Sequence, residues 1–178
     1  MFPDEDLGMN LVHLYFVHMN PLAPVLHRPS FERKIMQGVH LRNPAFGTVY
    51  LLVCAAASRY SDDPRVFLEG LESGITEQSA GWKFFEQVQM VRRSLLGPPC
   101  LEDLQTYCVG VLSCLSWFVK VSQSQLSVLY LQGTSAPQAC WTIVGIGIRL
   151  AQDVGAHRRK SYNGKNSVEG ELWKRAFW

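Results

Sequence analysis

The sequence lacks the cysteine spacing that metal clusters and disulfide frameworks require. Its 178 residues include five cysteines, which are Cys54, Cys100, Cys108, Cys114 and Cys140. No two of them form a Cys-x-x-Cys pair, and their number is odd. The sequence therefore predicts neither a zinc cluster nor a set of disulfides. We expect these cysteines to act as small buried hydrophobic residues.

A strong charge of one sign and a long apolar run are also absent. The formal net charge is +2, which creates no strong field for attracting nucleic acid. Residues 1–6 are acidic, unlike the positive start of a secretory signal, and the apolar run from Phe46 to Ala57 is too short to cross a bilayer of about 30 Å. With 47% hydrophobic residues, the composition predicts one soluble intracellular domain that makes no membrane contact.

Catalytic patterns are missing as well. The sequence contains no G-x-S-x-G, H-E-x-x-H or phosphate-loop motif. Gly145-Ile-Gly147 does not fit the dinucleotide fingerprint, because position 150 is leucine and no strand precedes it. His13 and His18 lie about 140° apart around a helix, so they cannot ligate one metal ion from the same helix. We therefore expect no enzyme activity, no metal and no cofactor in this chain.

What the sequence does contain is helical periodicity. Apolar residues recur at helical spacing along nearly the whole chain, and strict alternation is rare. This pattern predicts an all-α, irregular multi-helix domain over residues 1–178. The predicted helices cover residues 7–19, 30–39, 44–59, 79–96, 101–118 and 135–154, with a last helix after Ser167. Asn43 and Pro44 are the N-cap and first residue of one of them.

The helix predicted for residues 135–154 is the most informative. Its polar residues occupy a narrow stripe, which is typical of a buried helix. One packed face is expected to contain Trp141, Val144, Ile148 and Ala151. Gly145 and Gly147 each cost about 1 kcal/mol relative to alanine within a helix, which indicates close approach to another helix. A Gly145→Leu substitution is therefore expected to overpack that face.

Polar residues at the end of this helix also lead to expectations. An unpaired buried arginine would be costly, so we expect Arg149 to pair with Asp153 or with Glu171. Gly155 suits the left-handed position that ends a helix. His157 follows it, where a cation complements the helix dipole. For His157 we expect a structural role rather than contact with a ligand.

Together these residues resemble the signature of the fungal-specific transcription factor domain. This domain is the middle homology region of fungal binuclear zinc-cluster transcription factors. The matching signature residues are Trp141, Gly145, Arg149, Gly155, His157, Glu171, Arg175, Phe177 and Trp178. Upstream, residues 24–31 resemble the opening Pro-x-x-His-x-x-x-Phe motif of the family, and residues 55–64 resemble a further landmark. The resemblance thus covers almost the whole chain, in the right order.

The resemblance implies a regulatory domain that modulates transcription in the nucleus. Zinc and DNA would be bound by a cysteine-rich module that this chain does not carry. Its partners would be a small-molecule effector, the transcription machinery or a second copy. An alternative is a helical protein-interaction module without a small-molecule site. An enclosed apolar pocket would favour the ligand sensor, whereas an exposed apolar groove would favour the interaction module.

Two features depart from the family pattern. Residues 119–130 are predicted to be an insertion, because their removal joins Trp117-Phe118 to Leu131 at the usual spacing of the family. The family also continues with further helices beyond Phe177 and Trp178. We therefore expect a domain that is incomplete at its C-terminus and that exposes apolar side chains.

Overall fold

All regular secondary structure in the described residues is helical, which confirms the all-α prediction. The computed structural model describes residues 1–68, 79–88, 99–121, 136–158 and 168–177. The α-helices are α1 (Glu5–His18), α2 (Arg28–Met36), α3 (Val39–Arg42), α4 (Pro44–Ala57), α6 (Trp82–Phe85), α7 (Leu101–Val121), α9 (Ala136–Asp153) and α10 (Val168–Phe177). Two short 3-10 helices are η1 (Ser58–Tyr60) and η2 (Pro64–Val66).

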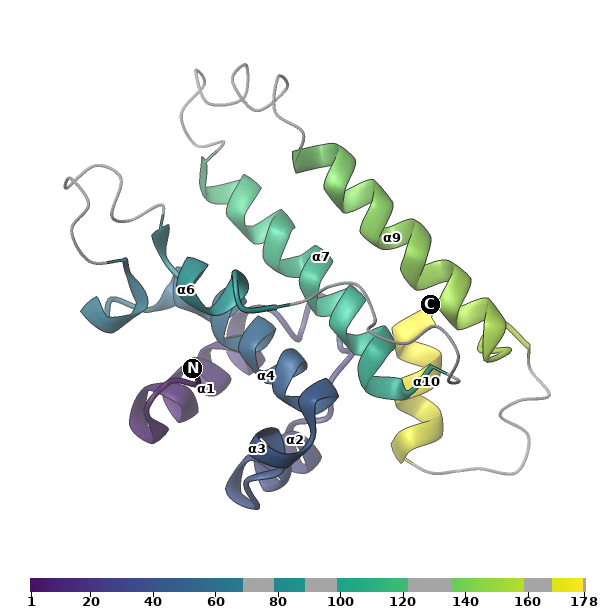
Figure 1. Cartoon of the computed structure of the whole chain (residues 1–178), viewed down its shortest axis with the longest axis horizontal. Helices are drawn as coiled ribbons and strands as arrows, with labels where there is room; N and C mark the ends of the chain where they lie inside the picture. The colour runs from purple at the N-terminus through teal and green to yellow at the C-terminus, as the bar shows by residue number, and fades with distance from the viewer. Residues whose placement is uncertain (69–78, 89–98, 122–135, 159–167, 178) are drawn as a thin grey trace.

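Helix α7 lies between α4 and α9. It packs against α4 on one side and against α9 on the other, and α7 and α9 run side by side (Figure 1). Helix α1 covers α4, while α10 contacts α7. Helix α9 is therefore an outer layer, and one of its long faces has no described helix packed on it.

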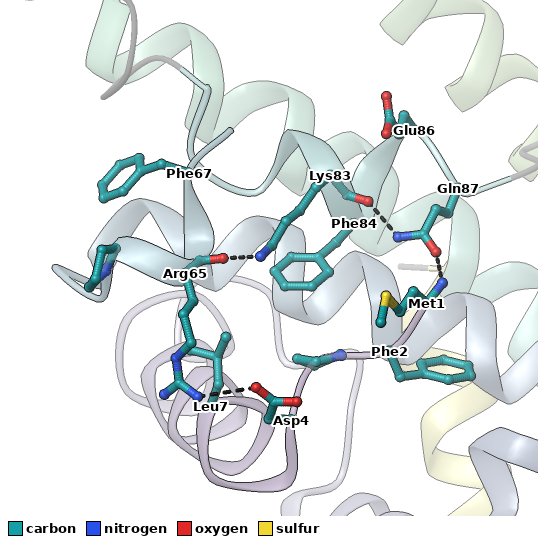
Figure 2. Close-up of a pocket in the computed structure, with 12 residues that line it drawn as sticks. Met1, Phe2, Asp4, Leu7, Arg65, Phe67, Lys83, Phe84, Glu86 and Gln87 are labelled. Carbon is teal, nitrogen blue, oxygen red and sulfur yellow. Dashed lines mark hydrogen bonds and ion pairs between the residues drawn. The ribbon is translucent and has the colours of Figure 1, made fainter. Parts of the chain in front are cut away.

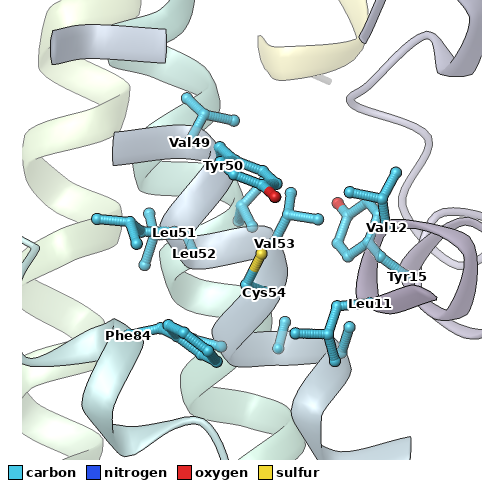
Figure 3. Packing of buried hydrophobic residues seen from close by; sticks show 14 of the residues in the cluster. Leu11, Val12, Tyr15, Val49, Tyr50, Leu51, Leu52, Val53, Cys54 and Phe84 are labelled. Atoms are coloured by element: carbon cyan, nitrogen blue, oxygen red, sulfur yellow. The ribbon is translucent and has the colours of Figure 1, made fainter. Parts of the chain in front are cut away.

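The main core forms around α4. Residues 49–57 of this helix are all buried, and Leu52 belongs to the same core cluster as Leu11 of α1, both of them fully excluded from solvent (Figure 3). The start of α4 confirms the predicted cap, because the Asn43 side chain accepts hydrogen bonds from the Ala45 and Phe46 amides at 3.0 and 3.3 Å. A helix buried on nearly every side explains the continuous apolar run in this part of the sequence.

Several predicted helices have different bounds in the structure. A continuous helix over residues 79–96 is wrong, because Gly81 is left-handed and α6 ends at Phe85; residues 89–98 lie outside the described part. Helix α2 begins at Arg28, earlier than expected, because proline in the first helical turn has no amide hydrogen bond to lose. Helix α7 continues to Val121, into the predicted insertion; that insertion stays a prediction.

The three cysteines with described side chains differ in exposure. Cys54 is buried as expected, whereas Cys100 is exposed, so the expectation of burial is wrong there. Cys108 of α7 is partly buried and its thiol donates a hydrogen bond to the Ala176 carbonyl at 3.3 Å. Burial raises the pKa of Cys108 to about 11, which keeps the thiol protonated as a donor. This bond ties α10 to α7.

Tyr15 of α1 gives a first testable prediction. Its side chain is fully buried and its hydroxyl has no hydrogen-bond partner among the described residues. A buried unsatisfied hydroxyl costs about 1–3 kcal/mol, so Tyr15→Phe is expected to leave the free energy of unfolding unchanged or to raise it. Urea denaturation measures the effect. The control is Ser113→Ala, which removes a buried hydroxyl that donates to the Val109 carbonyl at 2.9 Å and should destabilise the fold. A clear loss in Tyr15→Phe would contradict the unsatisfied hydroxyl.

Candidate functional site

The outward face of α9 is apolar and exposed. Trp141, Val144 and Ile148 are 79%, 37% and 48% exposed. At about 100° per residue they share one helical face with Gly145. A Cβ built on Gly145 meets no described atom within 4 Å. We call Trp141, Val144, Gly145 and Ile148 the α9 stripe. The expectation that this face would be packed and buried is wrong.

The inward face of α9 packs on α7. Ala151 is 2% exposed, and a Cβ added to Gly147 would lie 3.2 Å from the Cβ of Tyr107. The close helix approach is therefore at Gly147, not at Gly145 as expected. Because apolar residues occur nearly all around α9, its sequence did not show which side would face α7.

Arg149 is exposed beside the α9 stripe, and its predicted ion pair is wrong. In the described part of the chain, no ion pair joins Arg149 to Asp153 or to Glu171. The Glu171 carboxylate instead pairs with Arg175 at 3.1 Å and with Lys174 at 3.6 Å, all within α10. Since α9 is an outer helix, solvent can hydrate the Arg149 guanidinium, so no buried partner is needed.

The end of α9 brings several signature residues together. Gly155 has φ +74°, which confirms the predicted left-handed position. The following Ala156 amide donates to the Ala151 carbonyl at 2.8 Å, as in a Schellman motif. Beyond this turn, the His157 ring contacts Phe177 of α10, with ring centroids 6.4 Å apart.

A small apolar cluster surrounds this turn, and its buried members are Leu104, Ala151 and Ala156. The signature residues thus separate into two groups. Gly155, His157 and Phe177 lie where α9 approaches α10, whereas Trp141, Gly145 and Arg149 lie on the exposed side of α9. Glu171 and Arg175 form an exposed pair within α10. Trp178 lies outside the described residues.

A pocket lies between the start of the chain, η2 and α6. Its volume is about 450 Å³. Its walls include Phe2, Leu7, Phe67, Lys83, Phe84 and Gln87 (Figure 2). The polar groups of the wall bond to one another: the Lys83 ammonium donates to the Arg65 carbonyl, and Gln87 accepts from the amino group of Met1. These polar groups stabilise the wall of the pocket.

Arg65 beside this pocket joins three carboxylates. Its guanidinium lies 2.6 Å from Asp6, 2.9 Å from Asp63 and 3.3 Å from Asp4. The hydrogen bonds from Arg65 hold the pKa of Asp6 and of Asp63 below their usual range. Sequence analysis missed this cluster because Asp4 and Asp6 are far from Arg65 along the chain. The only local signal was Asp63, which caps η2 by accepting from the Arg65 amide at 2.9 Å.

Arg65→Ala is expected to lower the melting temperature at neutral pH and low salt, because three carboxylates lose their cation. The depressed pKa values of Asp6 and Asp63 mean that their pairs with Arg65 stabilise the fold at neutral pH. This contribution is lost as the pH falls below about 3.8, the ordinary aspartate value. The difference from wild type should therefore shrink in acid and in high salt. Thermal denaturation at neutral and acid pH checks this, with exposed Arg33→Ala as the control. A difference that persists in acid would contradict the role of the pairs.

No metal site is present in the described part of the chain, where no group of three or more His, Cys, Asp or Glu residues could hold a metal ion. The residues present do not fit a zinc cluster, which needs closely spaced cysteine ligands. Within the same ranges, no helix is both long enough and apolar enough to span a membrane.

Comparison with known families identifies the same family that the signature residues resemble. The family described as "Fungal specific transcription factor domain" matches residues 12–178. The chain belongs to this family. The description of this family ties the fungal specific transcription factor domain to transcription factors.

Relatives of this fungal specific transcription factor domain are named as transcription factors. The chain is 26% identical over 176 residues to an "ABC-transporter-regulating transcription factor" of Aspergillus fumigatus, covering 99% of this chain and 18% of that protein. It is 24% identical to the "C6 finger domain transcription factor nscR" of the same species, covering 95% of this chain and 20% of that protein. The chain thus spans about a fifth of the length of these relatives. No solved structure matches it significantly.

Proposed function

We propose that this chain is the regulatory domain of a fungal zinc-cluster transcription factor and adjusts transcription through contacts between helices. The family match over residues 12–178 supports the regulatory role. The observation that carries the helix contact is the α9 stripe, which leaves Trp141 79% exposed on the outer layer of the fold. Isolated exposed apolar residues are common, but a row of them on one helix marks a contact surface.

The pocket beside Arg65 supports a ligand-sensing role less well. Two of its cations already have partners within the fold: Arg65 pairs with three carboxylates, and Lys83 donates to the Arg65 carbonyl. Ligand sites typically enclose most of the ligand and present a few convergent polar groups. The exposed apolar α9 stripe therefore favours an interaction module, the second of the two functions that the sequence left open.

Helix α9 has one exposed face and one face packed on α7, and this arrangement suggests how a partner could change the activity of the domain. Among the described side chains, the buried cluster at the end of α9 is Leu104, Ala151 and Ala156, whereas α1 and α4 belong to a larger core. Helix α9 is an outer helix, and its described buried contacts lie on the side that faces α7. A partner on the α9 stripe would favour one packing of α9 against α7 over another, which is the population shift that we propose for regulation.

Zinc binding, DNA binding and nuclear location belong to the proposal for the parent protein. A separate cysteine-rich module would hold zinc and read DNA, and this chain would adjust the outcome without chemistry of its own. Printed names such as "C6 finger domain transcription factor" support this division. Specific reading of DNA needs side chains on an element that enters a groove, with several phosphate contacts, and the net charge of +2 offers little attraction.

A titration of the purified chain with fluorescent duplexes tests this proposal. The duplexes are target sites of the fungal relatives and scrambled versions of the same composition. We expect weak binding that disappears at physiological salt and does not depend on sequence. Sequence-selective binding that survives physiological salt would overturn the assignment of this chain as a regulatory rather than a DNA-reading domain.

A further inference from the structure

Residues 2–4 precede α1 and form one wall of the pocket; we call them the strap. The opposite wall comes from η2, Phe67 and α6 (Figure 2). The strap is held at two points, by the Phe2 ring and by the Asp4 carboxylate. We propose that the strap is a pH-dependent latch, which opens the pocket when the His40 ring gains a proton. This inference goes beyond the proposed function, because it concerns the pocket and not the α9 stripe.

The Phe2 ring fits between α3 and α4. It meets the His40 ring edge-on, with ring centroids 5.0 Å apart, and it stacks on Tyr50 with ring centroids 5.8 Å apart. A Cβ on Gly47 would lie 3.1 Å from the Phe2 ring, so glycine at this position lets the ring approach the α4 backbone. The strap is therefore held at this end by ring contacts, and His40 supplies one of the two rings.

The His40 ring suits this place only when it is neutral. Its Nδ1 atom is buried and has no hydrogen-bond partner among the described residues. A neutral imidazole can leave one nitrogen without a proton, whereas the imidazolium must donate from both nitrogens. Protonation of the closed state would therefore bury a charged N–H group without an acceptor, which is costly. Burial accordingly lowers the pKa of His40 from its ordinary value of 6.5.

The charged and titratable groups around His40 do not offset this cost. Tyr50 of α4 faces the ring, and burial raises its pKa, so that its hydroxyl stays neutral; the charge of Glu5 in α1 adds to the same shift. The Asp4 carboxylate of the strap pairs with η2 at 3.3 Å, and Arg42 of α3 donates to a backbone carbonyl at 2.7 Å. Movement of the strap, which lets water reach Nδ1, is what relieves the cost of the charged ring.

Arg65 holds the other end of the strap through a different kind of contact. Its guanidinium pairs with Asp4 at 3.3 Å (Figure 2) and with Asp6 of α1 at 2.6 Å. Exposed ion pairs contribute modestly and weaken in salt. The Asp6 pair persists at about pH 5, because the hydrogen bond from Arg65 holds the pKa of Asp6 below its usual range. A change between about pH 8 and about pH 5 at constant salt therefore reports on His40 rather than on Arg65.

Hydrogen exchange of the whole chain tests the latch. The reporter is the Gly8 amide, which donates to the Asp4 carbonyl at 2.7 Å and so joins the strap to α1. After correction for the intrinsic rate, its protection in wild type is expected to fall between about pH 8 and about pH 5. The fall should not exceed about 30-fold, the proton-binding ratio at about pH 5 of a group whose pKa is 6.5.

Two variants show whether His40 causes this fall. His40→Phe should remove it, because phenylalanine keeps the ring contacts and carries no titrating group. His18→Phe is the matched control, since it keeps a ring beside Tyr60 at another place on the fold, and its protection should fall as in wild type.

Titration of His40 by NMR supplies the reciprocal test. If the closed strap disfavours the proton, the open strap must favour it by the same factor. Phe2→Ala, which removes the ring between α3 and α4, is therefore expected to raise the pKa of His40 toward 6.5. This test does not depend on the stability of His40→Phe.

Each of the other outcomes would overturn the latch. These are wild-type protection that does not change with pH, a His40→Phe variant that keeps the wild-type fall, and a pKa of His40 that Phe2→Ala leaves unchanged. Stronger protection in acid would also overturn it, because the protonated ring would then be held by the faces of Phe2 and Tyr50.

Discussion

A Gly81→Ala substitution is expected to lower the free energy of unfolding by roughly 2–5 kcal/mol. Gly81 has φ +79°, and a left-handed alanine costs about 1–2 kcal/mol. Its Cβ would also lie 2.4 Å from the carbonyl oxygen of Ala55 in α4. Because that atom belongs to the backbone of the most buried helix, it cannot move away, and overpacking adds about 1–3 kcal/mol. Urea denaturation measures the loss.

Gly38→Ala is the matched control for this prediction. Gly38 is also left-handed, with φ +64°, but its Cβ would lie 3.8 Å from the nearest atom, which belongs to the flexible side chain of Arg42. Gly38→Ala should therefore lower the free energy of unfolding only by the cost of a left-handed alanine, about 1–2 kcal/mol. Equal losses in the two variants would show that α4 does not approach Gly81 as closely as the structure indicates.

The two glycines of α9 should respond in opposite ways to leucine. Gly147→Leu is expected to cost about 1–3 kcal/mol, because its Cβ would press on Tyr107 of α7 at 3.2 Å. Gly145→Leu should leave stability unchanged or raise it by up to about 1 kcal/mol, since leucine favours a helix more than glycine does. Thermal denaturation of both variants at low protein concentration, where association is minimal, measures the difference.

This pair of variants decides how α9 is oriented. If Gly145→Leu is the more damaging variant, α9 packs through the face that contains Trp141, and the α9 stripe is not a surface. If the two variants lose stability equally, neither glycine marks the close approach. The predicted order, with Gly147 sensitive and Gly145 tolerant, is expected only for the packing seen here.

Local features of the fold were predictable because their causes are local. Asn43 and Pro44 mark the start of α4 through a cap and a fixed φ angle, and both act within one turn. The left-handed Gly155 follows from the same kind of reasoning. The ends of α9 also followed from its helical periodicity. Each of these predictions depends on residues that are close in sequence.

The orientation of α9 was not predictable because it depends on a tertiary choice. With apolar residues on nearly every side, the periodicity fits packing through Gly145 or through Gly147 equally well. Only the position of Tyr107 in the structure separates them. The wrong pairing of Arg149 follows from the same error, since a buried helix would have required a carboxylate partner. The contacts of Arg65 with Asp4 and Asp6 join segments that no local pattern connects.

A reporter assay tests the central claim, that this chain regulates transcription through the α9 stripe. The chain is fused between a heterologous DNA-binding domain and an activation segment, so that DNA reading is supplied from outside. The account predicts that the inserted chain changes reporter output. It also predicts that Trp141→Ala combined with Ile148→Ala removes most of that change at equal protein level, while Asp153→Ala preserves it. Reporter output that is indifferent to Trp141 and Ile148 would contradict the claim.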